Sequence, residues 1–487
     1  MIWCGPQTDL RPSEKHPRER PRRSSAASAG ERLRGDESNE LTSHNPRRRD
    51  LIAPSLSQAV ADRYFIPAVV LAALVGYVAI YASGLADTPI RSDGFEYYVY
   101  APALVLQHDP TLERFAKDCC AGNFPGPIGI SRWPSTGRLV DRHTMGVAIL
   151  VLPFFLVAHL LTLWANLPRD GFSLFYTHVC GLAAVFYLGA GLSLLKRLLR
   201  QYFRTGIVLV TLASIVWGTN LYHYATFDSL FSHVYSFFLL CCLLDLTGRW
   251  HAARSWTNSI KVGVVVGLII LVRAPNAVCF VLFALYGVVD LRTFKDKATD
   301  LLANWRHLAV IAIIVCVIQA PQLVIYHWAS GSWFINPYGG QWFHFGSPKI
   351  VEVLLSPQKG LFFWSPILLV SVIGLFWMFE LVRPFALGSL LVMLLTTYLI
   401  ASWDDWQFGG SYGHRAFTDV LPLLALSMAA GYERLTNRRG WTLPLAVGVA
   451  LTITLSVGQM SQYWLGIIPY RDTTWDTYRS VFLRFTR

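Results

Sequence analysis

The chain has 487 residues, of which 53% are hydrophobic and 15% are charged. Ordinary soluble domains carry about 25% charged residues, so this composition excludes a mainly soluble protein and is typical of one that spans a membrane. The net charge of +12 does not indicate nucleic acid as a partner, because Lys and Arg cluster in the N-terminal tail and in short gaps between apolar runs, a pattern that orients helices in a bilayer.

Residues 1–50 differ from the rest of the chain. They are rich in Arg, Ser, Pro and Glu and contain almost no aliphatic run, so we expect a disordered tail. They hold no apolar h-region, so they do not form a cleavable signal peptide. The basic run Arg47, Arg48 and Arg49 lies just before the first apolar segment and predicts a cytoplasmic N-terminus.

The remainder is dominated by apolar runs near the length that crosses lipid. They comprise residues 64–83, 145–166, 172–195, 205–224, 230–246, 259–272, 276–291, 308–328, 361–379, 384–401, 420–432 and 442–463. We therefore expect an all-α fold: a polytopic bundle of about 11–13 transmembrane helices over residues 51–463, with a C-terminal tail at residues 464–487. No internal repeat is evident, which argues against a transporter built from inverted repeats.

The positions of the basic gaps predict the topology. The gaps "LKRLLRQYFR", "GRWHAARS", "LRTFKDKATDLLANWRH" and "ERLTNRRG" fall on one side if every run from residue 172 onward crosses once. The long loops at residues 84–144, 330–360 and 402–418 then share the exoplasmic side. This topology agrees with a cytoplasmic N-terminus only if one of the early apolar runs does not cross the membrane. We expect residues 145–166, with Pro153 inside, to form a hairpin or a non-spanning helix.

The stretch "RSDGFEYYVYAP" places acids and aromatics where the chain leaves the first apolar run. On a helix, Asp93, Glu96, Tyr97 and Tyr100 share one face, and Tyr98 lies beside them. One interpretation is an interfacial helix whose acids face water. The other is a general base at the membrane surface, with aromatics to hold a sugar or a lipid phosphate.

Cationic side chains mark two later loops. In "SWDDWQFGGSYGHRAFT", His414 and Arg415 precede an apolar run, where the helix dipole and the guanidinium together would suit a phosphate. Lys359 lies at the membrane edge in "QKGLFFW", as a phosphate ligand or as a snorkelling side chain. The alternative for the first loop is a flexible interfacial turn with an aromatic belt.

Three ionisable residues lie close to lipid: Asp228 and His233 in "FDSLFSHVY", and Arg273 in "LVRAPN". Such residues are costly near lipid and are usually functional or paired. If they face one cavity, mutual ion pairing and a role in substrate binding are both open. Arg142 and His143 extend the same polar cavity in this hypothesis.

The stretch "SDGFEYYVYAPALVLQHDPTLERF" resembles the first exoplasmic loop of the GT-C superfamily of glycosyltransferases, which contains protein O-mannosyltransferases and lipid A aminoarabinose transferase. The segments "QKGLFFWSPILL" and "WQFGGSYGHRAFTDVLPLLAL" resemble late segments of bacterial members. In that superfamily an Asp or Glu shortly after the first transmembrane helix marks the active site. This chain lacks the Asp-Glu dipeptide, and its second acid, Glu96, lies three positions after Asp93, so the pattern points to Asp93 more than to Glu96.

The resemblance implies transfer of a sugar, with inversion, from a polyprenyl-phosphate donor to an exoplasmic glycan, lipid or protein acceptor. Asp93, with Glu96, would be catalytic. Binding of the substrate and the lipid phosphate would fall to a wider set: Arg415, Lys359, His414, Asp228, His233, Arg273, Tyr97 and Tyr98. No metal and no cofactor are expected. The alternatives are a transporter or flippase of lipid-linked sugars and a non-catalytic sensor or scaffold. The expected location is a bacterial inner or plasma membrane, with multiple passes.

Overall fold

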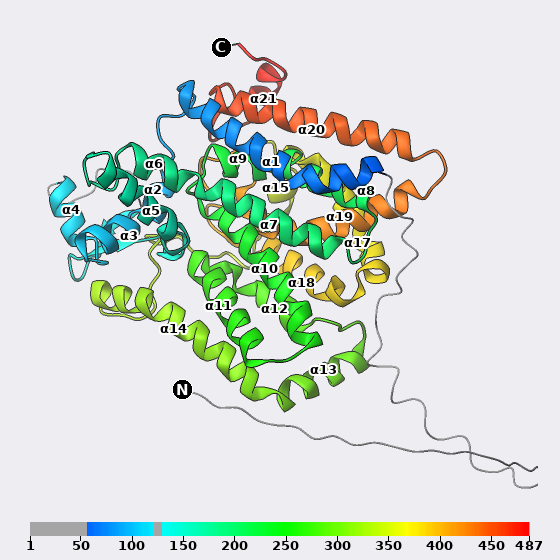
Figure 1. The fold of residues 1–487 in the computed structure, drawn as a ribbon, viewed down its shortest axis with the longest axis horizontal. Coiled ribbons are helices and arrows are strands. Elements are labelled where there is room, and N and C mark those ends of the chain that lie inside the picture. Colours follow the sequence, from blue (N-terminus) through cyan, green and yellow to red (C-terminus); the bar gives the residue numbers. More distant parts are fainter. Residues whose placement is uncertain (1–55, 121–128, 487) are drawn as a thin grey trace, which may run out of the picture. The chain divides into compact units, whose positions relative to one another are not determined.

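The computed structural model describes residues 56–120 and 129–486. The expected disordered tail at residues 1–50 lies outside them, and the folded unit runs from residue 51 to residue 487. Most of the described residues are helical and very few lie in strands (Figure 1), as the all-α prediction requires.

Every predicted apolar run contains helix, although the run at residues 276–291 leaves the helix after Ala284. Among the described residues, six helices are long and apolar enough to cross a membrane: α1 (Leu56–Ala82), α5 (Gly146–Trp164), α6 with α7 (Leu174–Gly181, Ala183–Leu199), α14 (Trp305–Ser330), α18 (Arg383–Ser402) and α20 (Thr442–Trp464). The shorter apolar helices are α8 (Thr205–Trp217), α11 (Trp256–Val272), η2 with α12 (Ala274–Cys279, Phe280–Ala284) and η3 with α17 (Pro366–Leu368, Leu369–Leu381). Helices α10 (Ser232–Ala252) and α19 (Leu421–Thr436) complete the set. The protein is therefore a multi-pass helical membrane protein, and the figure of 11–13 crossings stays a prediction.

The bundle interior is built around α17, α19 and α10, whose inward faces are buried. Helices α17 and α19 approach each other closely at Gly374, where an added Cβ would lie 1.8 Å from the carbonyl oxygen of Ser427. Small residues permit such backbone contact, which replaces the hydrophobic driving force that is absent between helices in lipid.

The segment at residues 145–166 forms one continuous helix, α5, with Pro153 inside it. The predicted hairpin is therefore wrong. Neighbouring helices can satisfy the backbone groups that a proline frees within a membrane helix, so Pro153 does not have to break it. The other alternative, a helix that does not span, stays a prediction.

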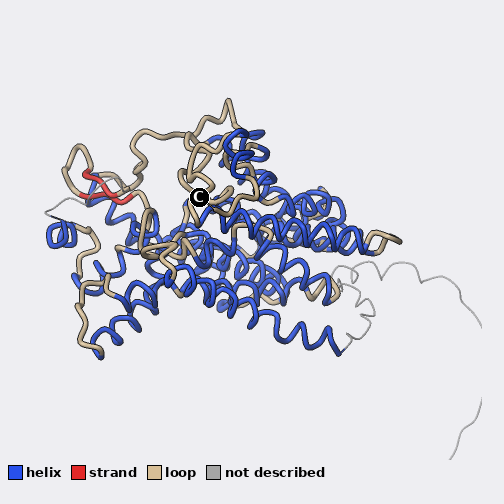
Figure 2. Tube along the Cα trace, turned by 90° about the horizontal axis from the view of Figure 1, so that it is seen from above, coloured by secondary structure: helices blue, strands red, loops and turns tan. Residues whose placement is uncertain are grey.

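The loops contain short elements. The first long loop holds α2 (Asp93–Tyr98), α3 (Tyr100–Pro102), the π-helix η1 (Ala103–Gln107), α4 (Glu113–Cys120) and an antiparallel pair, β1 (Ile130–Arg132) and β2 (Leu139–Asp141), in which Ser131 pairs with Val140. The remaining short elements are α9 (Leu221–Thr226), α13 (Leu291–Ala303), α15 (Ile350–Leu355), α16 (Leu361–Trp364), η4 (Arg415–Val420) and α21 (Trp475–Val481). Figure 2 shows the strand pair in red, among loops at one end of the helices.

The three long loops contact one another. The 84–144 loop reaches the start of the 330–360 loop, since the Thr136 hydroxyl donates to the carbonyl of Ala329. The 330–360 and 402–418 loops are joined by a hydrogen bond from the Trp342 N–H to Asp404 Oδ2 of 2.9 Å. An ion pair between Arg415 and Asp93 joins the first loop to the third. The predicted grouping of these loops is consistent with these contacts.

Residues 464–487 are not a free tail. Tyr478 of α21 packs against Phe363 and Trp364, and Gln462 Nε2 donates to the carbonyl of Val481 at 2.6 Å. Most of the segment therefore packs on the helices, and the predicted division at residue 463, next to the end of α20 at Trp464, stays a prediction. The aromatic side chains of "WDTYRSVF" explain why it packs, since they bury a large apolar area.

Candidate active site

Asp93 lies at the first position of α2, directly after a strained residue. Ser92 has φ +48° and ψ −137°, a conformation that a non-glycine residue adopts at a cost and that concentrates at functional sites. Arg415 Nη1 lies 2.7 Å from Asp93 Oδ2, and Arg142 Nη2 donates to Oδ1 at 3.2 Å. The turn thus presents a carboxylate between two guanidinium groups.

The charge state of Asp93 follows from these neighbours. Burial alone would raise the pKa of the carboxyl, but Arg415, His143 and Arg142 together outweigh burial and hold the pKa well below its ordinary value. Favourable interactions with nearby cations stabilise the ionised form. Asp93 is therefore a carboxylate at neutral pH.

Glu96 lies one helical turn further on, and both oxygens of its carboxylate already accept hydrogen bonds. It accepts the Gly129 N–H at 2.7 Å and the Arg142 guanidinium at 2.9 Å and 3.1 Å. The ring of His143 lies 2.5 Å away through Nδ1. Its side chain is 1% exposed, against 12% for Asp93. Glu96 thus fixes Arg142 and His143, and Asp93 is the acid with room for a substrate.

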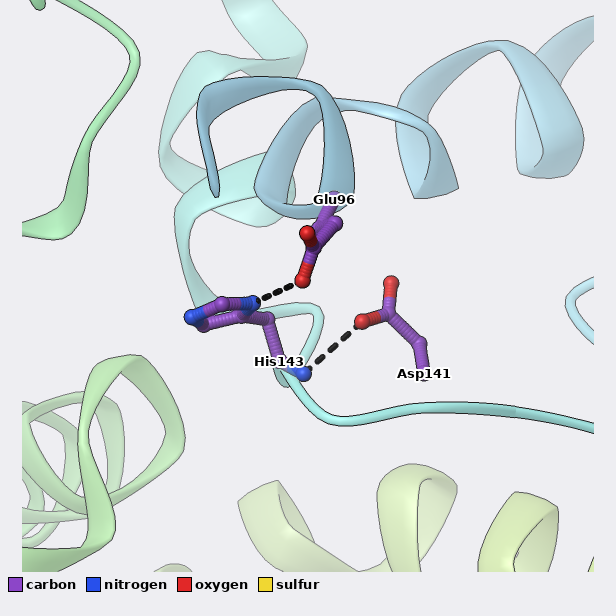
Figure 3. Close-up of side chains that lie close together, drawn as sticks. All are labelled: Glu96, Asp141 and His143. Atoms are coloured by element: carbon purple, nitrogen blue, oxygen red, sulfur yellow. Dashed lines mark hydrogen bonds and ion pairs between the residues drawn. The ribbon is translucent and has the colours of Figure 1, made fainter. Parts of the chain in front are cut away.

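Asp141, at the end of β2, is a buried acid that sequence reasoning missed. Its Oδ1 accepts the His143 N–H at 2.8 Å, whereas Oδ2 is buried and has no hydrogen-bond partner (Figure 3). Burial and the nearby Glu96 raise the pKa of Asp141 well above its ordinary value. The signal that could have found it is its position directly before Arg142 and His143.

Glu96, Asp141 and His143 are the set of described side chains that could hold a metal ion, with candidate ligand atoms within 4.8 Å of one another. A metal there would replace the bond between His143 Nδ1 and Glu96 and compete with Arg142, because these groups already saturate Glu96. The expectation of a metal-independent site stays a prediction.

A cationic cluster lies next to Arg415. Lys359 is buried, and its ammonium group donates to the carbonyls of Ser411 and, at 2.9 Å, Tyr470, but pairs with no described carboxylate. Burial, with the nearby Arg415 and Arg471, lowers the pKa of Lys359 to about 7. Snorkelling is therefore wrong for Lys359, because its head group points inward and not to water.

His414 lies beside Lys359 and Arg415 and is also buried. The backbone of Trp406 lies near its ring, but neither ring nitrogen forms a well-aligned hydrogen bond with a described residue. Burial, with Lys359 and Arg415 nearby, lowers the pKa of His414 to about 3, so the imidazole is neutral. Unpartnered buried polar atoms are rare and call for a ligand or water. Arg415 is the first residue of the 3-10 helix η4, which runs directly into α19 at Leu421, so the helix-dipole part of the anion hypothesis stays a prediction.

Asp228 does not join His233 and Arg273 in one cluster, so the single-cavity hypothesis is wrong. Asp228 Oδ1 accepts from Arg91 Nη2 at 2.9 Å, and Oδ2 lies 2.9 Å from His223 Nε2. Trp464 Nε1 in turn donates to His223 Nδ1 at 2.9 Å. This chain of bonds ends at Arg91, two positions before Asp93, and so fixes the start of α2.

His233 and Arg273 meet instead at Asp419, a residue that sequence reasoning missed. The Asp419 carboxylate lies 2.8 Å from His233 Nδ1, 2.9 Å from Arg273 Nη1 and 2.8 Å from Asn276 Nδ2. A cavity bordered by Arg273, Asn276, Trp403 and Phe408 opens beside this network. His233 and Arg273 are thus paired with Asp419 and not with Asp228, so mutual ion pairing among the three predicted residues is wrong, and their role in substrate binding stays a prediction.

The structure places Tyr97 and Tyr98 in different surroundings. The ring of Tyr97 packs on that of His143, with centroids 4.2 Å apart, and so borders the site. Tyr98 points away, since its hydroxyl donates to the Gly171 carbonyl at 2.5 Å and its ring lies against Phe155 and Phe172. Its predicted place in the substrate site is wrong, because adjacent residues on a helix point in different directions.

Comparison with known proteins gives matches among solved structures alone: no family model matches the chain, and no curated protein does. The apo oligosaccharyltransferase of Archaeoglobus fulgidus is similar with a TM-score of 0.44 and 12% identity, over 87% of this chain and 60% of that one. The oligosaccharyltransferase AglB of the same organism, in complex with an inhibitory peptide and a dolichol-phosphate, gives 0.42 and 11%, over 88% and 60%. This chain thus spans about three fifths of the length of the proteins it matches.

Proposed function

We propose that the protein is a membrane glycosyltransferase that moves a sugar from a polyprenyl-phosphate donor to an exoplasmic acceptor hydroxyl, with inversion. The observation that carries the proposal is the pairing of Asp93 with Arg415 at 2.7 Å, where the chain leaves the first apolar helix. A lipid-linked donor has its tail in the bilayer and its reacting carbon at the surface, so an acid and a phosphate ligand belong at this level.

The reaction is a single displacement at the anomeric carbon. Asp93 takes the proton from the acceptor hydroxyl, the acceptor oxygen bonds to the anomeric carbon, and the bond from that carbon to the phosphate oxygen breaks. The polyprenyl phosphate leaves with one additional negative charge. One displacement inverts the configuration, and the cations stabilise the charge that develops on the leaving group.

Arg415 must exchange partners in this scheme. In an inverting displacement the base and the leaving group lie on opposite faces of the anomeric carbon, so the guanidinium that contacts Asp93 turns to the phosphate when the donor binds. Its new neighbours there are Lys359 and His414, whose polar atoms lack carboxylate partners. The donor thus neutralises the cations and releases the base at the same time.

The alternative is a transporter or flippase of lipid-linked sugars. A transporter places its key polar groups near the bilayer midplane. Here Asp93, Glu96 and Arg142 lie in the first long loop and Arg415 in the third, which favours the transferase.

Purified protein in vesicles, supplied with isotope-labelled polyprenyl-phosphate sugars and a panel of acceptors, tests the proposal. We expect labelled acceptor, together with unlabelled polyprenyl phosphate. Arg415→Ala should weaken donor binding by about tenfold or more, and more than Lys359→Ala does, because Arg can engage phosphate bidentately. Arg439→Ala, an exposed arginine between α19 and α20, is the matched control and should leave donor binding unchanged.

Two results would contradict the proposal. If labelled donor crosses the bilayer intact and no acceptor is labelled, the protein is a flippase. If Arg415→Ala and Lys359→Ala bind the donor like the Arg439→Ala control, neither residue is a phosphate ligand.

A further inference from the structure

Helix α13 (Leu291–Ala303) has no buried residue and makes most of its specific contacts through one side. On that side Asp300 pairs with Arg254 of the α10–α11 turn, and Lys297 Nζ lies 3.2 Å from His251 Nδ1 of α10. Leu301 packs against the edge of the core. The helix begins with a capping box, in which Asp290 and Thr293 exchange hydrogen bonds, so its start is fixed by its own sequence.

A second side of α13 is apolar and uncovered. Leu291, Phe294, Ala298 and Leu302 follow one another at intervals of three or four residues, so they form one stripe along the helix. We extend this stripe to Trp305, the exposed first residue of α14, which lies beyond the turn at Asn304. The exposed fractions of the four large side chains are 82% for Leu291, 50% for Phe294, 72% for Leu302 and 60% for Trp305. Apolar area of this extent is not left in water without a partner.

The third side is polar and exposed. It carries Arg292, Lys295, Asp296 and Thr299, between the apolar stripe and the side that contacts α10. A helix with one side against protein, one apolar and one polar is suited to a boundary between two media. Contact between the apolar stripe and a second copy of the chain would require neither a polar side next to the stripe nor a neighbouring helix that faces lipid.

The neighbouring segments show which medium covers the apolar stripe. Trp305, the last member of the stripe, is also the first residue of α14, the most apolar of the candidate spans and 17% buried, so α14 itself faces lipid. Trp256, at the start of α11, is 53% exposed and stacks on His307 of α14 at 4.2 Å. Tryptophans at the ends of apolar helices mark the level of the lipid headgroups. Figure 1 shows α13 continuing from this end of α14.

We infer that α13 is an interfacial helix that lies in the membrane surface, with the stripe from Leu291 to Trp305 in the boundary between headgroups and acyl chains. Its partner is the phospholipid bilayer. The basic gaps place this surface on the predicted cytoplasmic side. The helix anchors the turn between α12 and α14 to the leaflet opposite the candidate active site, and this inference does not depend on the proposed glycosyl transfer.

Photo-crosslinking in the intact, reconstituted protein tests the inference. A benzoylphenylalanine is placed at Phe294, at Leu302, or at the matched control Thr299 on the polar side, in vesicles of phosphatidylcholine and phosphatidylglycerol. All of these positions are exposed or nearly so, so the variants should fold, and size-exclusion chromatography with circular dichroism checks this. We expect phospholipid adducts, detected by mass spectrometry, at positions 294 and 302 in about fivefold or greater excess over position 299, because only the apolar side reaches the acyl region.

Three results would overturn the inference. Equal adduct yields at positions 294 and 299 would mean that the helix lies in water. Crosslinks from position 294 or 302 to a second copy of the chain would mean that the stripe is a dimer interface. Crosslinks within the same chain, with no lipid adduct, would mean that another segment covers the stripe.

Discussion

Two acids three positions apart in the chain, Asp93 and Glu96, receive different environments from the fold. Glu96 is held by a backbone N–H, a guanidinium and an imidazole, whereas Asp93 contacts two guanidinium groups and keeps more exposure. A group whose acceptor sites are all taken cannot also accept a substrate proton without breaking existing bonds. The assignment of Asp93 as the base and Glu96 as the residue that positions Arg142 rests on this difference.

Asp93→Asn should reduce turnover by about a hundredfold or more, the usual scale for the loss of general-base help. Donor binding should persist or tighten, because Arg415 is no longer neutralised by the carboxylate. Initial rates of sugar transfer and a donor-binding titration on the same preparation measure both effects. Near-normal transfer by Asp93→Asn, with an inactive but folded Glu96→Gln, would show that Glu96 is the base.

Lys359 should make donor affinity depend on pH. Burial and two nearby arginines lower its pKa to about 7, so in the empty site the ammonium form dominates below that pH and is lost above it. A phosphodiester donor keeps one charge throughout, and His414 stays neutral because its pKa is about 3. Affinity should therefore be highest below neutral pH and fall as pH rises from about 6 to about 8.5.

Donor titrations across that range measure the slope. In Lys359→Met the affinity should be lower at acidic pH and nearly independent of pH. A slope that is equally steep in Lys359→Met would assign the titration to another group, or to none in the site.

At the scale of elements, one carboxylate joins three helical segments. Asp419 of η4 accepts from His233 of α10, from Arg273 at the end of α11 and from Asn276 of η2. The ends of α11 and η2 adjoin in the chain, but α10 and η4 come from other parts of it, and the shared acid fixes the direction of η4, which begins at Arg415. The network thus connects the bundle interior with the candidate active site.

Asp419→Asn should destabilise the protein by about 3 kcal/mol or more, because it leaves the buried Arg273 cation without a counter-charge. Thermal unfolding in detergent measures the effect. Asp404→Asn is the control: Asp404 also pairs with a histidine, His344, but this pair is exposed to solvent, so the change should lower the unfolding temperature far less than Asp419→Asn does.

The double variant Asp419→Asn with Arg273→Met should recover part of the loss, because it removes the uncompensated charge together with its partner. If the double variant loses as much stability as the two single variants together, the two side chains act independently.

At the scale of the whole molecule, the long loops and the C-terminal segment meet on one side of the bundle, whereas the basic gaps lie elsewhere along the chain. Lys359 of the second loop bonds to Ser411 of the third and to Tyr470 near the C-terminus. The site is thus shared by segments that are separated by most of the chain. A membrane cannot lie between segments that touch, so all of these segments lie on the same side of it.

Single cysteines placed at exposed positions of the three loops should all react with an impermeant maleimide from outside intact cells. Pro134→Cys, Trp342→Cys and Asp404→Cys serve for this, and Arg439→Cys, in a basic gap, should react only after lysis. The expected pattern follows from the excess of Lys and Arg in cytoplasmic gaps. Labelling of any loop position only after lysis would contradict the shared exoplasmic site.

The sequence by itself determined the class of the protein and the extent of its helices. Runs such as residues 308–328 and 442–463 are long and apolar enough that no other backbone structure satisfies their polar groups in lipid, so α14 and α20 follow directly from local composition. The sequence also singled out Asp93, Lys359, His414 and Arg415, because they stand among aromatic side chains at the ends of apolar runs, in the loops opposite the basic gaps.

Only the tertiary structure decided which of these groups meet. Asp228 pairs with Arg91, and Arg273 with Asp419, although Asp228, His233 and Arg273 had the same local signal. Asp419 gave no signal as an isolated acid, and Asp141 only that of its position before Arg142 and His143; both gain their importance from burial and from partners up to 186 positions away. Ion pairing and desolvation depend on distances between segments distant in the sequence, which local composition does not contain; the packing of the helices sets them.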